Sequence, residues 1–364
     1  MMRYTVKREF PSDLVLGDKG PQVTILLPTH RELPERRQDV VLYRQLLKDA
    51  EEALRAGYPE EAHGTILKAL QSLEEDQEFW EGTRDGLAVL ANGNGVWVYI
   101  LDTALEALAV VGEGLRLRPL LAAFQKDRAY EVLAISGKEY QVYRGNREEL
   151  HPLDLGKEVP RTIEEILGQE HTEKYTTAGT YGADGGAFFH GQGAKKDDVK
   201  QDLENFYRQI DRLVYEHVSA ESHLPLILAN LHERQSLFHK VAKNPFLLEK
   251  GADYSYDTHD LETLRERVWA ILAEEEQEKG RALAARFQEA WAKGLGTDQL
   301  EEARRAAREG RMEVLLLEEG QGYPGNEEAL DELVRLVLEK QGEVFFLPGA
   351  ELEMKDGLAA IFRF

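Results

Sequence analysis

A glutamine between two glycines, with two lysines just after it, is the part of this sequence best suited to contact another molecule. The segment reads His190-Gly191-Gln192-Gly193-Ala194-Lys195-Lys196. Glycine adopts backbone torsions that other residues avoid, so its neighbours' N–H groups and the Gln192 amide can press closely against a ligand. The two lysines suit a polyanionic cavity. The residues also allow another interpretation, in which the segment is an ordinary surface loop followed by a capped helix.

The elements on either side of this segment would have to position it. Upstream, glycines and threonines recur over 168–186, which is too polar and glycine-rich to pack as a helix or strand. Downstream, we predict a long helix with Asp197 or Asp198 as its N-cap. Its apolar residues follow a helical period: Val199, Leu203, Phe206, Tyr207, Ile210, Leu213, Val214 and Val218. On this helix His217 falls on the inward face and is interpreted as a hydrogen-bonded core histidine.

The rest of the chain alternates helices with short apolar strands, which predicts a mixed α/β (α+β) fold. Strong signals include the hairpin 86–101 around Asn92-Gly93-Asn94-Gly95, a second hairpin over 130–144, and a helix from about Asp39 to Gly57. We expect three domains, 1–124, 125–257 and 258–364, because 364 residues exceed the usual size of a single core.

Composition limits the function classes. The chain has no cysteine, 42% hydrophobic and 31% charged residues, and a net charge of −22. It has no apolar run long enough for a membrane span and no apolar signal core near Met1, so we expect a cytoplasmic protein without membrane contact. We expect no cofactor and no metal. The charge argues against indiscriminate nucleic-acid coating.

The negative charge is unevenly distributed. Residues 1–50 hold nine Lys/Arg and seven Asp/Glu, and residues 186–250 hold nine of each. Residues 251–364 hold fourteen Lys/Arg and twenty-six Asp/Glu, a balance of −12. The acidic end therefore favours a protein partner over RNA.

Two further patterns lack the residue spacing that their chemistry requires. Gly320-Gln321-Gly322-Tyr323-Pro324-Gly325 spells GxGxxG, but two glutamates separate it from the preceding strand and Glu343 precedes the next strand, so dinucleotide binding is disfavoured. His232-Glu233 begins like a zinc-binding helix, but Ser236 stands where the second histidine is required.

The chain resembles the class 1 release factor and Pelota superfamily, most closely the bacterial archaeo-eukaryotic release factor (baeRF) proteins. The resemblance covers nearly the whole chain. It is carried by Val23-Thr24-Ile25-Leu26-Leu27-Pro28-Thr29-His30-Arg31, Val132-Leu133-Ala134-Ile135-Ser136, His190-Gly191-Gln192-Gly193, Met312-Glu313-Val314-Leu315-Leu316-Leu317-Glu318-Glu319 and Gly357-Leu358-Ala359-Ala360-Ile361-Phe362-Arg363-Phe364.

The resemblance implies a release-factor-like first domain, a middle domain whose Gly-Gly-Gln loop enters the peptidyl-transferase centre, and an L7Ae-like last domain that contacts a translational GTPase. Gly191 and Gln192 match the second and third loop positions, whereas His190 replaces the first glycine. Because the residue at that position then carries a β-carbon, the backbone shape attributed to hydrolysis is put in doubt. The turn Arg55-Ala56-Gly57-Tyr58-Pro59 lacks the Asn-Ile-Lys-Ser motif, which disfavours stop-codon reading.

The resemblance implies a ribosome-associated factor that occupies the A site in rescue or hibernation. In it Gly191, Gln192 and Gly193 would approach the tRNA acceptor end, with His190, Lys195 and Lys196 on rRNA or tRNA. The alternatives are a peptidyl-tRNA hydrolase acting through Gln192, and a cytoplasmic adaptor outside translation.

Overall fold

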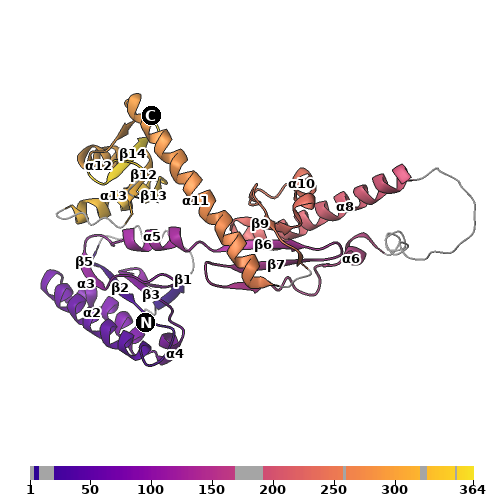
Figure 1. Ribbon diagram of the computed structural model, residues 1–364. Helices are drawn as coiled ribbons and strands as arrows, with labels where there is room; N and C mark the ends of the chain where they lie inside the picture. The colour runs from indigo at the N-terminus through magenta and orange to yellow at the C-terminus, as the bar shows by residue number, and fades with distance from the viewer. Residues whose placement is uncertain (1–3, 8–19, 169–191, 257–259, 320–325, 349–350) are drawn as a thin grey trace, which may run out of the picture. The chain divides into compact units, whose positions relative to one another are not determined.

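The chain forms two compact units in a computed structural model. One unit comprises residues 1–127 and 277–364, the other residues 128–276. The structure describes residues 4–7, 20–168, 192–256, 260–319, 326–348 and 351–364, and of 192–200 only the backbone. Three sheets with flanking helices make the fold mixed α/β, as predicted (Figure 1).

The unit 128–276 has a five-stranded mixed sheet in the order β10-β9-β6-β7-β8. Its strands are β6 (Tyr130–Ile135), β7 (Tyr140–Gly145), β8 (Leu150–Pro152), β9 (Leu226–Asn230) and β10 (Ala252–Asp253). The predicted hairpin is confirmed, because β6 pairs antiparallel with β7.

Alternation along β6 divides this unit into three layers. Leu133 and Ile135 pack with helices α8 (Gln192–Val214) and α10 (His232–Val241) on one face. Val132 and Ala134 pack with the first half of helix α11 (Leu261–Ala292) on the other. Side chains on a strand point alternately to opposite faces, so a strand covered on both sides is apolar on both faces, as β6 is from Val132 to Ile135.

The first sheet of the other unit has the strand order β1-β4-β3-β2-β5. Its strands are β1 (Tyr4–Lys7), β2 (Gln22–Pro28), β3 (Gly86–Asn92), β4 (Gly95–Leu101) and β5 (Leu108–Gly112). The predicted hairpin is confirmed, with Asn92 paired to Gly95 across the turn. Helices α2 (Arg36–Gly57), α3 (Glu60–Glu74) and α4 (Gln77–Glu81) pack on one face.

The last sheet of this unit has the order β11-β14-β12-β13. Its strands are β11 (Gly296–Thr297), β12 (Met312–Glu318), β13 (Glu343–Leu347) and β14 (Leu358–Phe362), and helices α12 (Leu300–Arg308) and α13 (Glu327–Glu339) accompany them. Gly294, with φ of 70°, supplies the left-handed residue just after α11 ends.

One apolar core joins the two sheets of this unit. The same buried cluster contains Leu26 and Tyr99 of the first sheet, Leu120 of helix α5 (Arg118–Lys126), Leu315 of β12 and Leu333 of α13. The opposite face of the last sheet packs against the second half of α11. Each of the three predicted domain ranges contains one sheet; the three-domain division itself stays a prediction.

Candidate functional site

Of the predicted contact residues, Gln192, Gly193, Lys195 and Lys196 lie in the first two turns of helix α8. His190 and Gly191 fall outside the described residues, and so does the GxGxxG segment 320–325. Helix α8 begins at Gln192, ahead of both predicted caps, so Asp197 and Asp198 do not start it. Ala194, Lys195 and Lys196 are strong helix formers, which explains the earlier start. Gln192 and Gly193 therefore belong to the helix and not to a loop.

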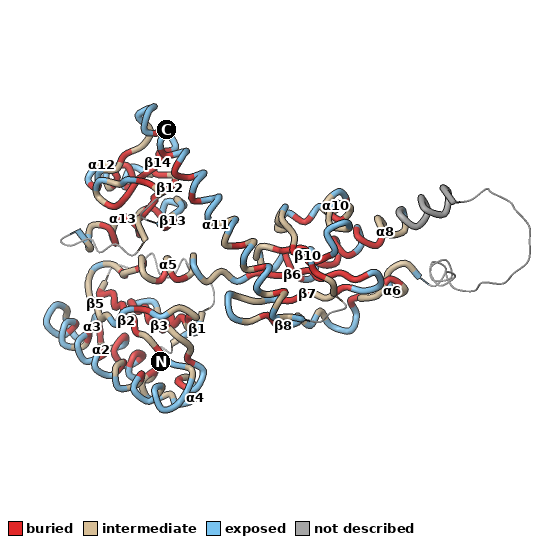
Figure 2. The backbone as a smooth tube through the Cα atoms, viewed as in Figure 1, coloured by how far each residue is buried: buried red, intermediate tan, exposed pale blue. Residues whose placement is uncertain are grey.

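Helix α8 is fixed to its sheet by one continuous apolar face. Phe206, Tyr207, Ile210 and Val214 are fully buried, and Leu203 is partly buried against the same cluster (Figure 2). The predicted period is thus confirmed over these residues. Burying each such side chain stabilises the packing by about 1.5–3 kcal/mol, so the helix is held firmly on its sheet from Leu203 to Val214.

Buried polar groups fix the same helix at its far end. The Asp211 carboxylate accepts hydrogen bonds from the backbone N–H of Lys243 (2.7 Å) and of Asn244 (3.4 Å). Asn244 in turn donates from Nδ2 to Ser219 Oγ at 3.0 Å. Burial raises the pKa of Asp211, and the two backbone hydrogen bonds act in the opposite direction. This network ties α8 to the segment that follows α10.

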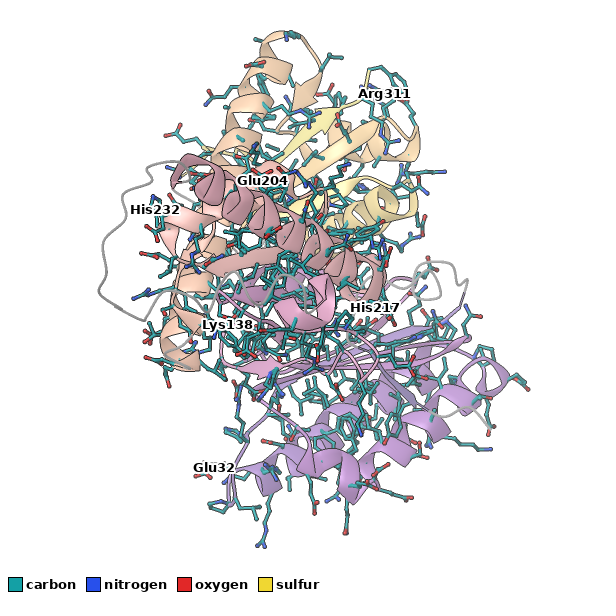
Figure 3. The ribbon with its side chains drawn as sticks, turned by 90° about the vertical axis from the view of Figure 1, so that its right-hand side faces the viewer. Glu32, Lys138, Glu204, His217, His232 and Arg311 are labelled. Carbon is teal, nitrogen blue, oxygen red and sulfur yellow. The ribbon has the colours of Figure 1, made fainter. Side chains whose placement is uncertain are left out.

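The prediction for His217 is wrong, because its side chain is exposed (Figure 3). The reason is a π-helical turn, η2 (Tyr215–Ser219), which follows α8 directly and leads into α9 (Ala220–Ser222). A π turn holds more residues than an α turn, so the register shifts. Val218 and Ser219 are buried while His217 turns outward.

On the upstream side, the described chain ends in a capped short helix, α6 (Ile163–Leu167). Thr162 and Glu165 form a capping box, in which each side chain bonds the other residue's backbone N–H. The Glu165 pKa is lowered, mainly by the hydrogen bond from the Arg161 backbone N–H. Ile163 and Ile166 pack in the cluster that holds α8, so both flanks of 169–191 are anchored on one face of the sheet.

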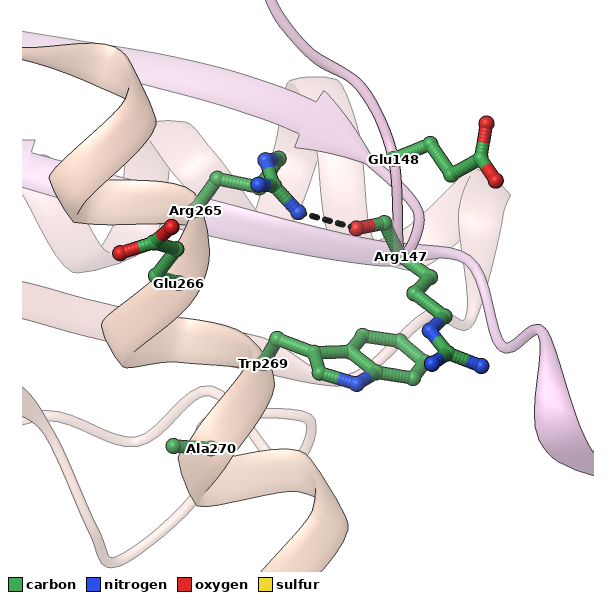
Figure 4. A pocket seen from close by; sticks show the side chains of 6 residues that line it. All are labelled: Arg147, Glu148, Arg265, Glu266, Trp269 and Ala270. Carbon is green, nitrogen blue, oxygen red and sulfur yellow. Dashed lines mark hydrogen bonds between the residues drawn. The ribbon is translucent and has the colours of Figure 1, made fainter.

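An open hollow of about 480 Å³ lies on the α11 side of this unit (Figure 4). Its lining residues are Arg147, Glu148, Arg265, Glu266, Trp269 and Ala270. Arg265 donates to the Arg147 carbonyl, and the Arg147 side chain lies beside the Trp269 indole. Two arginines and two glutamates balance, so the hollow has no clear preference for the charge of a ligand.

A second polar hollow, of about 690 Å³, lies beside the turn between α2 and α3. Arg55, Tyr58, His63, Lys68 and Gln71 are among its lining residues. This is the turn whose sequence lacks the stop-codon motif. His63 is buried, and its Nδ1 has no hydrogen-bond partner among the described residues.

A cluster of charged residues that no sequence pattern predicted lies at one edge of the first sheet, where β2 ends, β3 begins and β4 ends. His30 follows β2 and bonds the buried Asp39 of α2 through Nδ1, at 2.7 Å. Arg31 binds Asp85 (2.9 Å) and Asp102 (3.0 Å). The available signal was Asp39, which is a charged residue among the inward-facing positions of a predicted helix.

Within the described ranges, no group of three or more His, Asp or Glu side chains is arranged to hold a metal ion. No helix in the described part of the chain is long and apolar enough to cross a bilayer.

Comparison with known proteins defines the class. The model of bacterial archaeo-eukaryotic release factor family 3 matches residues 129–311, which is half of the chain. The chain therefore belongs to this family, and its resemblance to release factors and Pelota proteins is confirmed.

Similarity to solved structures is low in identity and broad in coverage. An archaeal translation termination factor, aRF1, is 15% identical, with 97% of this chain and 95% of that chain covered and a TM-score of 0.25. Dom34 from S. cerevisiae, a translation termination-like factor described as interacting with Hbs1, is 14% identical over 77% of this chain and 79% of that chain, with a TM-score of 0.45. Archaeal Pelota, in a ribosome-bound assembly with ABCE1, is 11% identical over 96% of this chain and 92% of that chain, with a TM-score of 0.39. No curated protein matches the chain.

Proposed function

We propose that this protein is a ribosome-associated translation factor that occupies the A site during rescue or hibernation. The observation that carries the proposal is the family match over 129–311, which includes His190-Gly191-Gln192-Gly193 and all of α8. In this proposal the start of α8 brings Gln192 near the tRNA acceptor end, with His190, Lys195 and Lys196 against rRNA or tRNA.

The packing of α8 supports this role. A segment that enters a ribosomal cavity needs a support that does not bend, and the buried face of α8 together with the Asp211–Asn244–Ser219 network provides one. Catalytic or binding groups carried by a rigid element keep their geometry better than those on a free loop.

For residues 258–364 we propose an L7Ae-like domain that contacts a translational GTPase. Its acidity favours a protein partner, because opposite charges across an interface raise the association rate. Pull-down with the full chain should recover such a GTPase in a salt-sensitive manner. Recovery of RNA alone would contradict this assignment.

A substitution at the start of α8 tests the function. Gln192→Ala should leave the free energy of unfolding within about 0.5 kcal/mol of the wild type, because glutamine and alanine are both strong helix formers, and should weaken ribosome occupancy in co-sedimentation. His151→Ala, an exposed histidine of the same unit, is the control. A protein that does not sediment with ribosomes at any salt concentration would contradict the proposal and favour an adaptor.

The hydrolase alternative has its own test. His190→Gly restores a Gly-Gly-Gln triplet, so it should raise cleavage of peptidyl-tRNA if the β-carbon of His190 prevents the required backbone shape. Strong cleavage by the unchanged protein, abolished in Gln192→Ala, would establish the hydrolase as the better description.

A further inference from the structure

Helix α11 is one continuous helix that belongs to two different cores (Figure 1). Its first half packs in the core of the unit 128–276 through Leu264, Val268 and Leu272. Its second half packs against the last sheet through Leu283, Ala284, Phe287 and Ala290. All of residues 273–279 between them are described, and none is buried. This span of about two turns therefore adds no side chain to either core.

The sequence of this span is unfavourable for a helix that has no core to pack on. It reads Ala273-Glu274-Glu275-Glu276-Gln277-Glu278-Lys279, with four glutamates and one lysine. Glu274 and Glu278 are four residues apart, and like charges at this spacing destabilise a helix. Gly280 follows, and glycine is the least favourable helix residue after proline. Short helical segments without tertiary packing are marginal in water, so the span depends on contacts from outside the helix.

Two cations from outside the helix compensate the glutamates. Arg128 Nη1 bonds Glu276 Oε2 at 3.0 Å, and Lys250 Nζ lies 3.3 Å from Glu274 Oε1. The Glu276 side chain is 23% exposed, and its Oε1 is buried without a hydrogen-bond partner among the described residues. Arg128 is therefore the principal group that compensates the Glu276 carboxylate.

The Arg128–Glu276 pair also has a particular place in the chain. Arg128 is the first residue of the unit 128–276 and Glu276 is the last. Their ion pair thus holds together the two ends of this unit, at the point where α11 leaves its core. On the other side of the span, Lys279 bonds Glu343 of β13 at 2.5 Å. Contacts at both ends of the span therefore fix it, and its middle has none with a core.

We propose that residues 273–279 form a conformational joint in α11, which opens locally while both flanking halves of the helix stay packed, and which Arg128 holds closed. Local opening is easiest where a segment has few buried apolar contacts. Each flank keeps its own core when the joint opens, because no core residue lies within the span. The joint is independent of the proposed ribosome association.

Hydrogen exchange of the full chain, followed by mass spectrometry, tests the joint. In the wild type, the amides of 274–279 should exchange faster than those of 264–272 and 283–290. Arg128→Gln should raise the exchange rate of 274–279 by about 3- to 10-fold, because the Glu276 carboxylate then loses its partner. The exchange of both flanks should stay unchanged.

Two further variants separate the ion pair from general effects. Adding Glu276→Gln to Arg128→Gln should restore most of the wild-type exchange rate, because the uncompensated carboxylate is then gone. Arg208→Gln is the matched control. It breaks an exposed pair with Glu204 on α8, at 3.2 Å in the same unit, and should leave exchange in α11 unchanged.

Three results would overturn the proposal. Equal exchange rates along the whole of α11 in the wild type, or a uniform increase along the helix in Arg128→Gln, would mean that the helix opens as one piece. An unchanged rate at 274–279 in Arg128→Gln would mean that the ion pair does not hold the joint. Co-sedimentation with ribosomes tests the proposed function separately, and failure of one test leaves the other standing.

Discussion

At the scale of single residues, Glu131 on β6 is a buried carboxylate that pairs with a single arginine among the described residues. Its side chain is fully buried, and Arg144 of β7 bonds Oε1 from Nη2 at 2.6 Å. Oε2 has no hydrogen-bond partner among the described residues. The Arg144 guanidinium is therefore the principal group that compensates this carboxylate.

Arg144→Leu should lower the free energy of unfolding by about 2 kcal/mol, because removal of one partner leaves a buried charge unpaired. Chemical denaturation of the full chain measures this loss in the free energy of unfolding. Adding Glu131→Gln should recover most of the loss, since the charge is then gone. Arg208→Leu, which breaks the exposed helical pair with Glu204, should change stability by less than about 0.5 kcal/mol. An equal loss in Arg144→Leu and Arg208→Leu would contradict this account.

At the scale of elements, the junction between α8 and the segment after α10 should make stability depend on pH. The pKa of Asp211 is raised from 3.8 by burial, so the folded protein holds this proton at a pH where the unfolded chain has released it. For an acid with a raised pKa, stability falls as pH increases from near the unfolded value through the folded one.

Asp211→Asn removes this titration. The free energy of unfolding of the wild type, relative to Asp211→Asn, should be highest at low pH and should fall as pH rises above about 4. The variant also loses one acceptor for the Lys243 and Asn244 N–H groups, which adds a constant offset. Denaturation of both proteins over a pH series gives the slope of this stability difference against pH. A difference that rises with pH would mean that the pKa of Asp211 is lowered and not raised.

At the scale of the whole molecule, residues far apart in sequence share one core. In the unit formed by 1–127 and 277–364, Asp331 of α13 accepts from Arg116 Nε (2.9 Å) and Arg118 Nε (2.7 Å). Gln125 also bonds the backbone of Phe346 in both directions, at 2.8 Å each. Burial raises the pKa of Asp331, and the two arginines oppose that shift.

Asp331→Leu should therefore reduce hydrogen-exchange protection in both sheets of this unit, by about 1–3 kcal/mol, because Arg116 and Arg118 lose the more buried of the two carboxylates that they share, Asp331 and Glu327. Glu332→Gln on the same helix is the control. Glu332 pairs with Arg304 and Arg308 of α12, so its loss should affect the last sheet alone. Loss of protection confined to β12 and β13 in Asp331→Leu would show that the two sheets unfold independently.

Local patterns in the sequence predicted the main helices and hairpins and the family resemblance. Helical and alternating apolar periods predicted α2, α8 and both hairpins, because these local patterns decide which face of an element can be buried. The segment around Gln192 was among the runs that carried the release-factor resemblance, and it lies within the range 129–311 that the family model matches.

Only the tertiary structure decided the positions that depend on contacts between distant residues. A π turn cannot be read from an α-helical period, so it reversed the expected burial of His217. Asp39 looked like the first residue of a helix, and its carboxylate instead holds His30 across a loop. Arg116 and Asp331 are 215 residues apart, and no local pattern records that pairing. Local sequence determines the backbone torsions of an element and which of its faces is apolar. Which distant residues pair with one another depends on the packing of the complete fold.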